Sequence, residues 1–195
     1  MTLLTLVRHG QTDWNLDRRI QGSTDIPLNE TGRADARAAA ERLLAGRHHA
    51  VYSSPLRRAR ETAEIIAERL GLPLQEPVAD VREREFGEGE GMLVEEYIAA
   101  YGDWHAPVPG AESLDEVGVR AISALHRIAR EARRRSAPTA ESVIVVAHGG
   151  VIRAVMDHVS GGTLPRVGEV LANGSAHRFE AAPGSLRLLD SAVLI

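Results

Sequence analysis

The stretch LVRHGQTDWN (residues 6–15) decides the fold, because an apolar run ends within it on a cation, an imidazole and a glycine. The run at residues 3–7 has the composition of a buried strand, and Arg8, His9 and Gly10 follow it without a break. In open α/β sheets, ligands bind beyond the carboxyl ends of the strands. These three residues are therefore the first candidates for a binding site.

The same pattern returns twice further along the chain. The apolar run SVIVVA (142–147) is the clearest strand and is followed by HGG (148–150), while a shorter strand at residues 50–53 leads to Arg57 and Arg58. If these strands are parallel, their carboxyl ends share one edge of the sheet, where two histidines and two or three arginines would meet. One histidine at a strand end is usually a bystander, but this repetition favours an anion site over coincidence.

The rest of the chain alternates between helix and strand patterns. Helices are predicted over residues 29–44, 55–70, 93–101, 113–135 and 149–159, and weaker strands over residues 74–78, 176–179 and 185–189, the last two at sheet edges. Ser113 and Glu116 form the sequence pattern of a capping box for the long helix. The alternation predicts an α/β fold, a three-layer α/β/α sandwich with a mostly parallel central sheet. Residues 1–195 are expected to form one domain with a lid-like insertion at about 88–113.

The composition excludes several classes of partner and several kinds of reactive group. The chain has 195 residues, 44% of them apolar, and a net charge of −4. No basic excess, bilayer-length apolar run or signal pattern is present, so we expect a cytoplasmic protein with no nucleic-acid and no membrane partner. Cysteine and lysine are both absent, which excludes disulfides, thiolate metal sites, Schiff bases and the lysine of a Walker-type loop. An anion site must then be built from arginine, histidine or backbone N–H groups.

Arginine and histidine together suit a phosphoryl group, whose oxygens accept from forked donors. A neutral imidazole is a good nucleophile near pH 7, and the glycines are expected to let the backbone approach the ligand. Gly149 and Gly150 open a helix, whose N-terminal N–H groups favour anions. A leaving alkoxide needs a proton, and the loop VREREFGEGEG (81–91) offers four glutamates, among which spacing does not choose.

Six blocks of the chain resemble the histidine phosphatase superfamily, in its phosphoglycerate-mutase-like branch. They occur in family order and span most of the chain: LVRHGQT (6–12), Asn15, QGSTDIPLNETG (21–32), SSPLRRARETA (53–63), REREFGEGEG (82–91) and VVAHGGVIRA (145–154). The resemblance implies a phosphoglycerate-mutase-like fold that needs no metal and no cofactor.

The resemblance also implies a role for each matching residue. His9 matches the nucleophile that becomes phosphohistidine, and Glu83 matches the proton donor. His148 matches a second histidine that binds phosphate and supports the transition state. The expected phosphate-binding residues are Arg8, Asn15, Arg58, His148 and Gly149, with Arg57 expected to be exposed.

The composition of the insertion bears on whether the phosphoryl group is released as phosphate or transferred to another hydroxyl. Residues 88–119 contain no arginine and eight acidic residues, which would repel a carboxylate-rich substrate. Tyr97 and Trp104 suit apolar or ring-shaped groups, although packing explains them equally well. Gly89 stands where the family usually has tryptophan, and Ala111 where it often has glycine, so both departures bear on specificity. Weaker specificity candidates are Gln21, Gly22, Tyr97, Trp104 and Glu112.

These observations favour a metal-independent phosphomonoesterase, a histidine acid phosphatase-type hydrolase acting on a small-molecule phosphate ester through phosphohistidine. The alternative is a phosphoglycerate mutase that transfers the phosphoryl group through the same intermediate. Arg18 and Arg19 keep that alternative open, because they follow the first motif and could reach an anionic substrate. A homodimer formed through the C-terminal strands or an exposed sheet edge is a further expectation.

Overall fold

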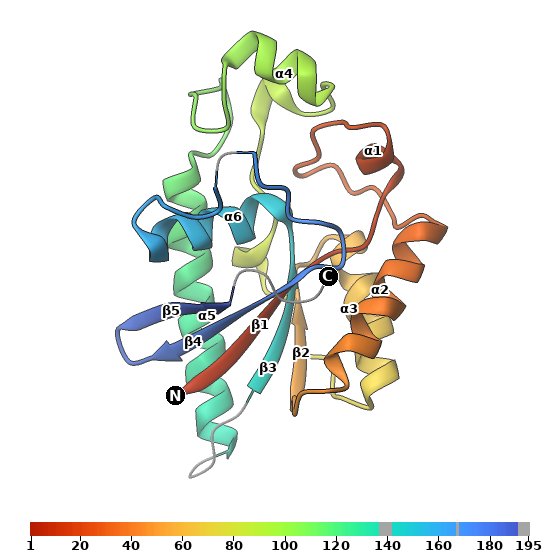
Figure 1. The fold of residues 1–195 in the computed structure, drawn as a ribbon, viewed down its shortest axis with the longest axis vertical. Coiled ribbons are helices and arrows are strands. Elements are labelled where there is room, and N and C mark those ends of the chain that lie inside the picture. The colour runs from red at the N-terminus through yellow and green to blue at the C-terminus, as the bar shows by residue number, and fades with distance from the viewer. Residues whose placement is uncertain (137–141, 167, 191–195) are drawn as a thin grey trace.

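The computed structural model describes residues 1–136, 142–166 and 168–190. A five-stranded sheet with the order β2-β3-β1-β4-β5 forms its centre (Figure 1). The three parallel strands are β2 (Ala50–Ser53), β3 (Ser142–Ala147) and β1 (Thr2–Arg8), and β4 (Ala176–Ala182) and β5 (Ser185–Asp190) run antiparallel to their neighbours. The predicted mostly parallel core of the sheet is therefore confirmed.

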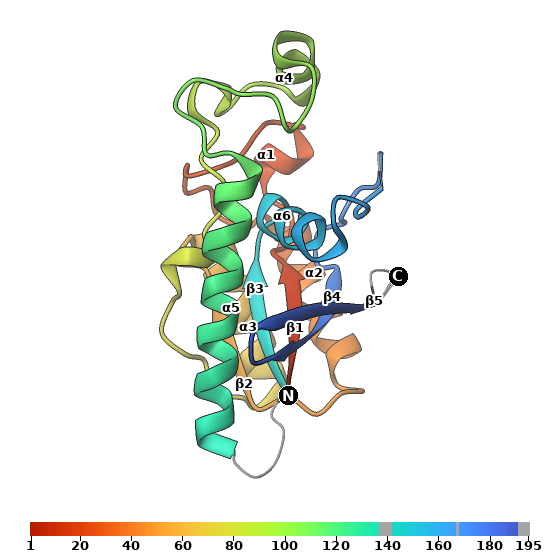
Figure 2. The same cartoon turned by 90° about the vertical axis from the view of Figure 1, so that its left-hand side faces the viewer.

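Helices cover both faces of this sheet (Figures 1 and 2). On one face α5 (Leu114–Ser136) and α6 (Gly149–Ser160) pack over Leu4, Leu6, Val143 and Val145. On the other, α2 (Glu30–Leu43) and α3 (Arg57–Leu70) pack over Val7, Val51, Ile144 and Val146. Successive strand residues thus point into opposite cores, as the pleat requires. The three-layer α/β/α sandwich predicted from the sequence is confirmed.

Local sequence signals account for the helix boundaries. The Asn29 side chain accepts from the Gly32 N–H at 2.9 Å and caps α2. Ser113 and Glu116 bond reciprocally before α5, at 3.2 Å and 2.8 Å, which confirms the predicted capping box. Gly71 ends α3 in the left-handed conformation, with φ of 63°. The four-residue helix α1 (Asp13–Leu16), capped by Thr12, was not expected, because it lies inside a polar loop.

Two strand predictions are wrong. Residues 74–78 form only an isolated bridge, Val51 to Leu74, because Pro73 and Pro77 interrupt the ladder. The segment still runs beside β2: the Val51 N–H donates to the Pro73 carbonyl, and the N–H groups of Gln75 and Val78 donate to the carbonyls of Val51 and Ser53. Strand β4 is not at an edge either, because it pairs with β1 on one side and β5 on the other.

The chain between α3 and α5 includes the insertion expected at residues 88–113, which lies beyond the carboxyl ends of the parallel strands (Figure 1). It contains the one-turn helices η1 (Ala79–Val81) and η2 (Gly87–Gly89) and the predicted helix α4 (Val94–Tyr101). A small apolar cluster of its own holds it, formed by Ile20, Phe86, Tyr97 and Val108. Trp104 stacks on Tyr97 with ring centroids 5.3 Å apart and also packs against the main core. In the described ranges, no helix is long and apolar enough to cross a membrane.

Candidate active site

The parallel register of β1 and β3 brings two histidines together. Arg8 lies opposite Ala147, so His9 and His148 each occupy the first position beyond their strand. The His9 N–H donates to the Ala147 carbonyl at 3.0 Å and extends the pairing past the strands. The two ring centroids lie 5.2 Å apart, and the rings are 3% and 0% exposed respectively.

The His9 ring has a fixed tautomer. Its Nδ1 lies 2.7 Å from the Gly10 carbonyl oxygen, which can only accept, so Nδ1 carries the hydrogen. Burial holds the His9 pKa well below its usual value, and the charges of Arg58 and Arg8 lower it further. The ring is therefore neutral at physiological pH, with a lone pair on Nε2. These are the properties that a nucleophilic imidazole needs.

His148 is held differently. Among the described residues, neither of its ring nitrogens has a hydrogen-bond partner. Burial lowers its pKa well below the usual value, with further lowering by Arg58 and by His9. His148 is the N-cap residue of α6, but its side chain makes no capping hydrogen bond, so packing alone holds the ring. It can therefore present either a donor or an acceptor to a ligand.

Arg58 lies in the first turn of α3 and is completely buried. Its Nη1 donates to the Thr24 carbonyl at 3.0 Å and its Nη2 to the Gly22 carbonyl at 2.7 Å. Its Nε has no partner in the described part of the chain. Burial lowers the Arg58 pKa to about 10, so the side chain remains a cation near neutral pH. A buried cation held by carbonyls alone is suited to binding an anion.

Arg8 approaches the same point from the end of β1. Its Nη1 donates to the Leu171 carbonyl, and its Nε has no partner among the residues described. Burial lowers its pKa, while the nearby Glu83 charge raises it. A Cβ at Gly149 would lie 3.3 Å from this Nε, so the glycine leaves room for the guanidinium.

Packing against α2 accounts for Gly10 without the approach of a ligand. A Cβ there would lie 2.1 Å from the Gly32 carbonyl oxygen. A Cβ at Gly32 would in turn lie 2.0 Å from the Gln11 carbonyl oxygen. The two glycines let the loop after β1 pack directly against the first turn of α2. The Gly10 N–H also donates to the hydroxyl of Thr62 on α3 at 3.1 Å, which holds the loop from a second side.

Glu83 is the glutamate of its loop that joins this cluster. Its Oε2 accepts from the Gly150 N–H at 3.0 Å, and its Oε1 accepts from Val151 at 3.2 Å and Arg84 at 2.8 Å. The N-terminus of α6, predicted from the sequence as an anion site, therefore holds this carboxylate. The structure distinguishes the four glutamates: Glu85 and Glu88 are exposed, and Glu90 bonds elsewhere.

Arg120 on α5 fixes the backbone of the Glu83 loop. It donates to the carbonyls of Arg82 at 2.8 Å and Glu83 at 3.1 Å. It also pairs with the Glu112 carboxylate at 2.7 Å, which accepts from the Glu85 N–H as well. Arg120 was not predicted as a site residue, because nothing in the sequence around it distinguishes it from the exposed arginines of α5.

Asn15 and Gln21 lie on the wall of the cluster. The Gln21 Oε1 accepts from the Thr12 hydroxyl at 3.0 Å, and its buried Nε2 has no partner among the described residues. The Asn15 Oδ1 accepts from Asn173 at 3.2 Å, and Asn173 also donates to the His9 carbonyl at 2.9 Å. Sequence reasoning missed Asn173, which lies in a loop far from every motif.

The lid candidates are arranged for packing. Tyr97 is completely buried, and a Cβ at Gly89 would lie 2.6 Å from its ring. The tyrosine therefore fills the space above Gly89, where the family usually has tryptophan. This geometry favours the packing role for Tyr97. Trp104 is half-buried and packs against Tyr97. Gly22 contributes its backbone carbonyl, which accepts a hydrogen bond from Arg58.

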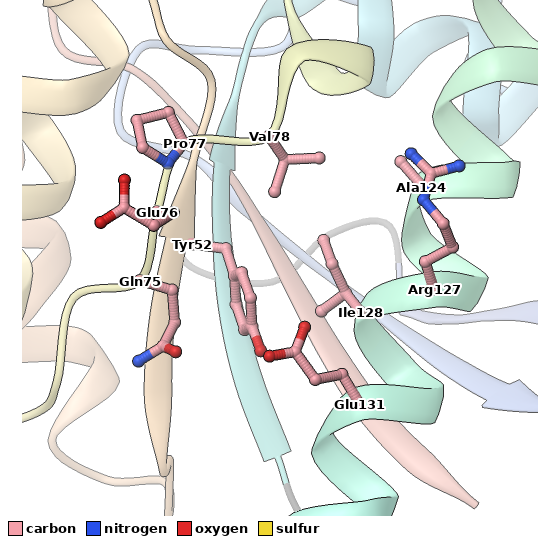
Figure 3. Close-up of a pocket in the computed structure, with 9 residues that line it drawn as sticks. All are labelled: Tyr52, Gln75, Glu76, Pro77, Val78, Ala124, Arg127, Ile128 and Glu131. Atoms are coloured by element: carbon pink, nitrogen blue, oxygen red, sulfur yellow. The ribbon is translucent and has the colours of Figure 1, made fainter.

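The groove in Figure 3 is a separate feature. It measures about 360 Å³ and lies between residues 75–78 and α5, with Tyr52 and Ile128 on its apolar floor. It contains none of the clustered histidines and arginines. Within residues 1–136, 142–166 and 168–190, no group of three or more histidine or acidic side chains is arranged to hold a metal ion.

A buried arginine, a half-buried arginine and two neutral histidines, with a carboxylate on the adjoining helix N-terminus, form a cluster suited to an anion on an α/β sandwich. Comparison with known proteins identifies the family. The model of the histidine phosphatase superfamily (branch 1) matches residues 4–192, and the chain belongs to this family.

The relatives are named both as phosphatases and as phosphoglycerate mutases. The "uncharacterized phosphatase PhoE" of Bacillus subtilis is 39% identical over 190 residues, covering 97% of this chain and 94% of the relative. A 2,3-bisphosphoglycerate-dependent phosphoglycerate mutase of Gloeobacter violaceus is 36% identical over 175 residues, covering 82% and 78%. The solved structure of a mycobacterial glucosyl-3-phosphoglycerate phosphatase matches with a TM-score of 0.82 and 29% identity, covering 96% of each chain.

Proposed function

We propose that this protein is a metal-independent phosphomonoesterase, which hydrolyses a small phosphate ester through a phosphohistidine on His9 with Glu83 as proton donor. The observation that carries the proposal is a group of buried nitrogens close to His9 that have no partner among the described residues. They belong to Arg8, Arg58 and His148, whose side chains lie around the neutral His9 ring. Buried donors of this kind are costly unless a ligand accepts from them.

The first half of the reaction forms a bond from His9 Nε2 to phosphorus and breaks the bond from phosphorus to the ester oxygen. Arg8, Arg58 and His148 stabilise the charge on the phosphoryl oxygens. Glu83, which enters this half in its protonated form, gives its proton to the departing alkoxide, which leaves as the alcohol. We expect Asn15 to hydrogen-bond the phosphoryl group, and Gly149 leaves room beside it for the Arg8 guanidinium.

The second half returns the enzyme to its starting state. The Glu83 carboxylate takes a proton from a water molecule, whose oxygen attacks phosphorus. The bond between phosphorus and Nε2 breaks, inorganic phosphate is released, and His9 is again neutral. The three N–H groups on Glu83 keep its carboxylate in one place through both halves.

The lid supports hydrolysis over transfer. Residues 88–119 contain no arginine, so they supply no cation for the carboxylate and second phosphate of a bisphosphoglycerate. The Arg19 side chain outside the lid donates to the Gly91 carbonyl at 3.0 Å. A phosphate ester of an uncharged alcohol suits such an entrance better than a carboxylate-bearing one.

The experiment measures phosphate release from p-nitrophenyl phosphate and a panel of phosphate esters in the presence of EDTA. Interconversion of 3-phosphoglycerate and 2-phosphoglycerate is measured in parallel. We expect EDTA-resistant release without isomerisation. Isomerisation at a rate comparable with hydrolysis would replace the proposal with the mutase reading, and no reaction in either assay would refute both.

A further inference from the structure

Glu90 lies in the same loop as Glu83, but its side chain bonds to a different part of the site. Its Oε1 accepts from the backbone N–H groups of Gly22 and Thr24, both at 3.0 Å. One carboxylate oxygen therefore fixes the turn at residues 22–24. Glu90 is half-buried, and it is the residue that ties the start of the lid to this turn.

The same turn holds Arg58 from its other side. The carbonyls of Gly22 and Thr24 accept from the two Nη atoms of Arg58, at 2.7 Å and 3.0 Å. These are the hydrogen bonds described for the Arg58 guanidinium, and they determine the direction in which its free Nε points. Displacement of the turn would therefore rotate or withdraw the guanidinium.

Close packing leaves the turn little freedom while Glu90 is in place. A Cβ at Gly22 would lie 2.4 Å from Glu90 Oε2 and 2.6 Å from the Arg84 carbonyl oxygen. The glycine is needed because the Glu90 carboxylate and the Arg84 backbone carbonyl both occupy that space. Burial lowers the pKa of Arg58, and the negative charge of Glu90 acts in the opposite direction and raises it, as do the charges of Glu83 and Asp25.

We propose that Glu90 is a positioning residue for phosphate binding, which acts on Arg58 through the turn at residues 22–24. This inference rests on the proposed function, because it takes Arg58 as a ligand of the phosphoryl group. It assigns to a lid residue a role in the affinity for phosphate itself, independent of the alcohol that the substrate carries.

The test compares Glu90→Ala and Glu90→Gln with Glu88→Ala as the matched control. Glu88 is exposed, and in the described chain its side chain forms no hydrogen bond or ion pair. The readouts are the Kd for inorganic phosphate by calorimetry, and kcat and KM with p-nitrophenyl phosphate. Thermal unfolding of each variant checks that it is folded.

We expect Glu90→Ala to raise both the Kd for phosphate and KM by about tenfold, with a smaller change in kcat, because a fixed donor becomes mobile. Glu90→Gln should stay within about threefold of the parent, since its amide oxygen can accept from the same two N–H groups. Glu88→Ala should match the parent. If Glu90→Ala does not fold, Glu90→Asp carries the same prediction, because its shorter side chain cannot reach both groups.

Two results would overturn the inference. One is a folded Glu90→Ala variant with the phosphate Kd of the parent, and the other is a Glu90→Gln variant as impaired as Glu90→Ala. Failure of the proposed function is distinguishable from both, because the parent protein would then neither release phosphate from esters nor bind it in the calorimeter.

Discussion

The ends of β1 and β3 carry the same residues, a histidine followed by glycine, but the structure uses them differently. His9 has its Nδ1 hydrogen fixed by the Gly10 carbonyl, whereas neither nitrogen of His148 has a partner in the described chain. Gly10 packs against α2, whereas Gly149 faces the Arg8 guanidinium. A repeated motif therefore indicates a shared site, but the neighbours of each copy determine its role.

The largest expected difference between the two ends is in turnover. His9→Ala should lower kcat by about 10⁴-fold or more, because it removes the atom that forms the covalent intermediate. Steady-state hydrolysis of p-nitrophenyl phosphate measures this, with circular dichroism as the check on folding. Substantial activity in a folded His9→Ala variant would end the distinction between the two histidines.

His148→Ala should cost less, about 10² to 10³-fold in kcat, which is typical of losing one donor to a developing charge. Phosphohistidine should still form on His9, only more slowly. Rapid quench with labelled substrate tests this, at alkaline pH so that the acid-labile phosphohistidine is preserved. Loss of all labelling in His148→Ala would show that the two histidines had been assigned in the wrong order.

The glycines should separate stability from binding. Gly10→Ala should lower the free energy of unfolding by about 3 kcal/mol, because the new Cβ meets backbone that cannot move aside. Gly149→Ala should change that free energy by less than about 1 kcal/mol, since its neighbour is a flexible side chain. It should instead raise KM by a few-fold through displacement of Arg8. Urea unfolding and steady-state kinetics on both variants would reveal whether the two effects are exchanged.

The last expected effect is one that the two rings share. Both have pKa values held below the usual 6.5, so below pH 6.5 the unfolded chain takes up protons that the folded protein does not. Stability should therefore fall on acidification from pH 7 to pH 5, by about 1.4 kcal/mol per pH unit for each ring at most. The double variant His9→Gln and His148→Gln should show a shallower decline in urea unfolding. An unchanged slope would mean that the rings charge as easily in the fold as outside it.

The fold was predictable because its strongest signals are local. The apolar runs at residues 3–7 and 142–147 and the caps Asn29 and Ser113 fix most elements near their observed bounds. Strand β4 was misplaced because a short, alternating strand gives no sign of which neighbours it will pair with. Residues 74–78 were misassigned because their backbone bonds with β2 without forming a ladder.

The chemistry of the site was predictable where residue type alone restricts it, at the histidines and at the arginines of the strand ends. The supporting contacts were not, because they depend on backbone groups that look alike in every sequence. Arg120 donates to the carbonyls of Arg82 and Glu83, and Asn173 donates to the His9 carbonyl from a loop far away in the sequence. Among four glutamates, only the path of the loop shows that Glu83 meets α6 and Glu90 meets the turn at 22–24.

The segment at residues 73–78 has a consequence for solubility. An unprotected edge strand invites pairing with other chains and is a common start of aggregation. Here the outward-facing groups of Val51 and the Ser53 carbonyl are already bonded to that segment, and its two prolines cannot donate to an incoming strand. The molecule thus shields one margin of its sheet with a strip of its own chain. A copy-to-copy sheet at this margin would first have to displace that strip.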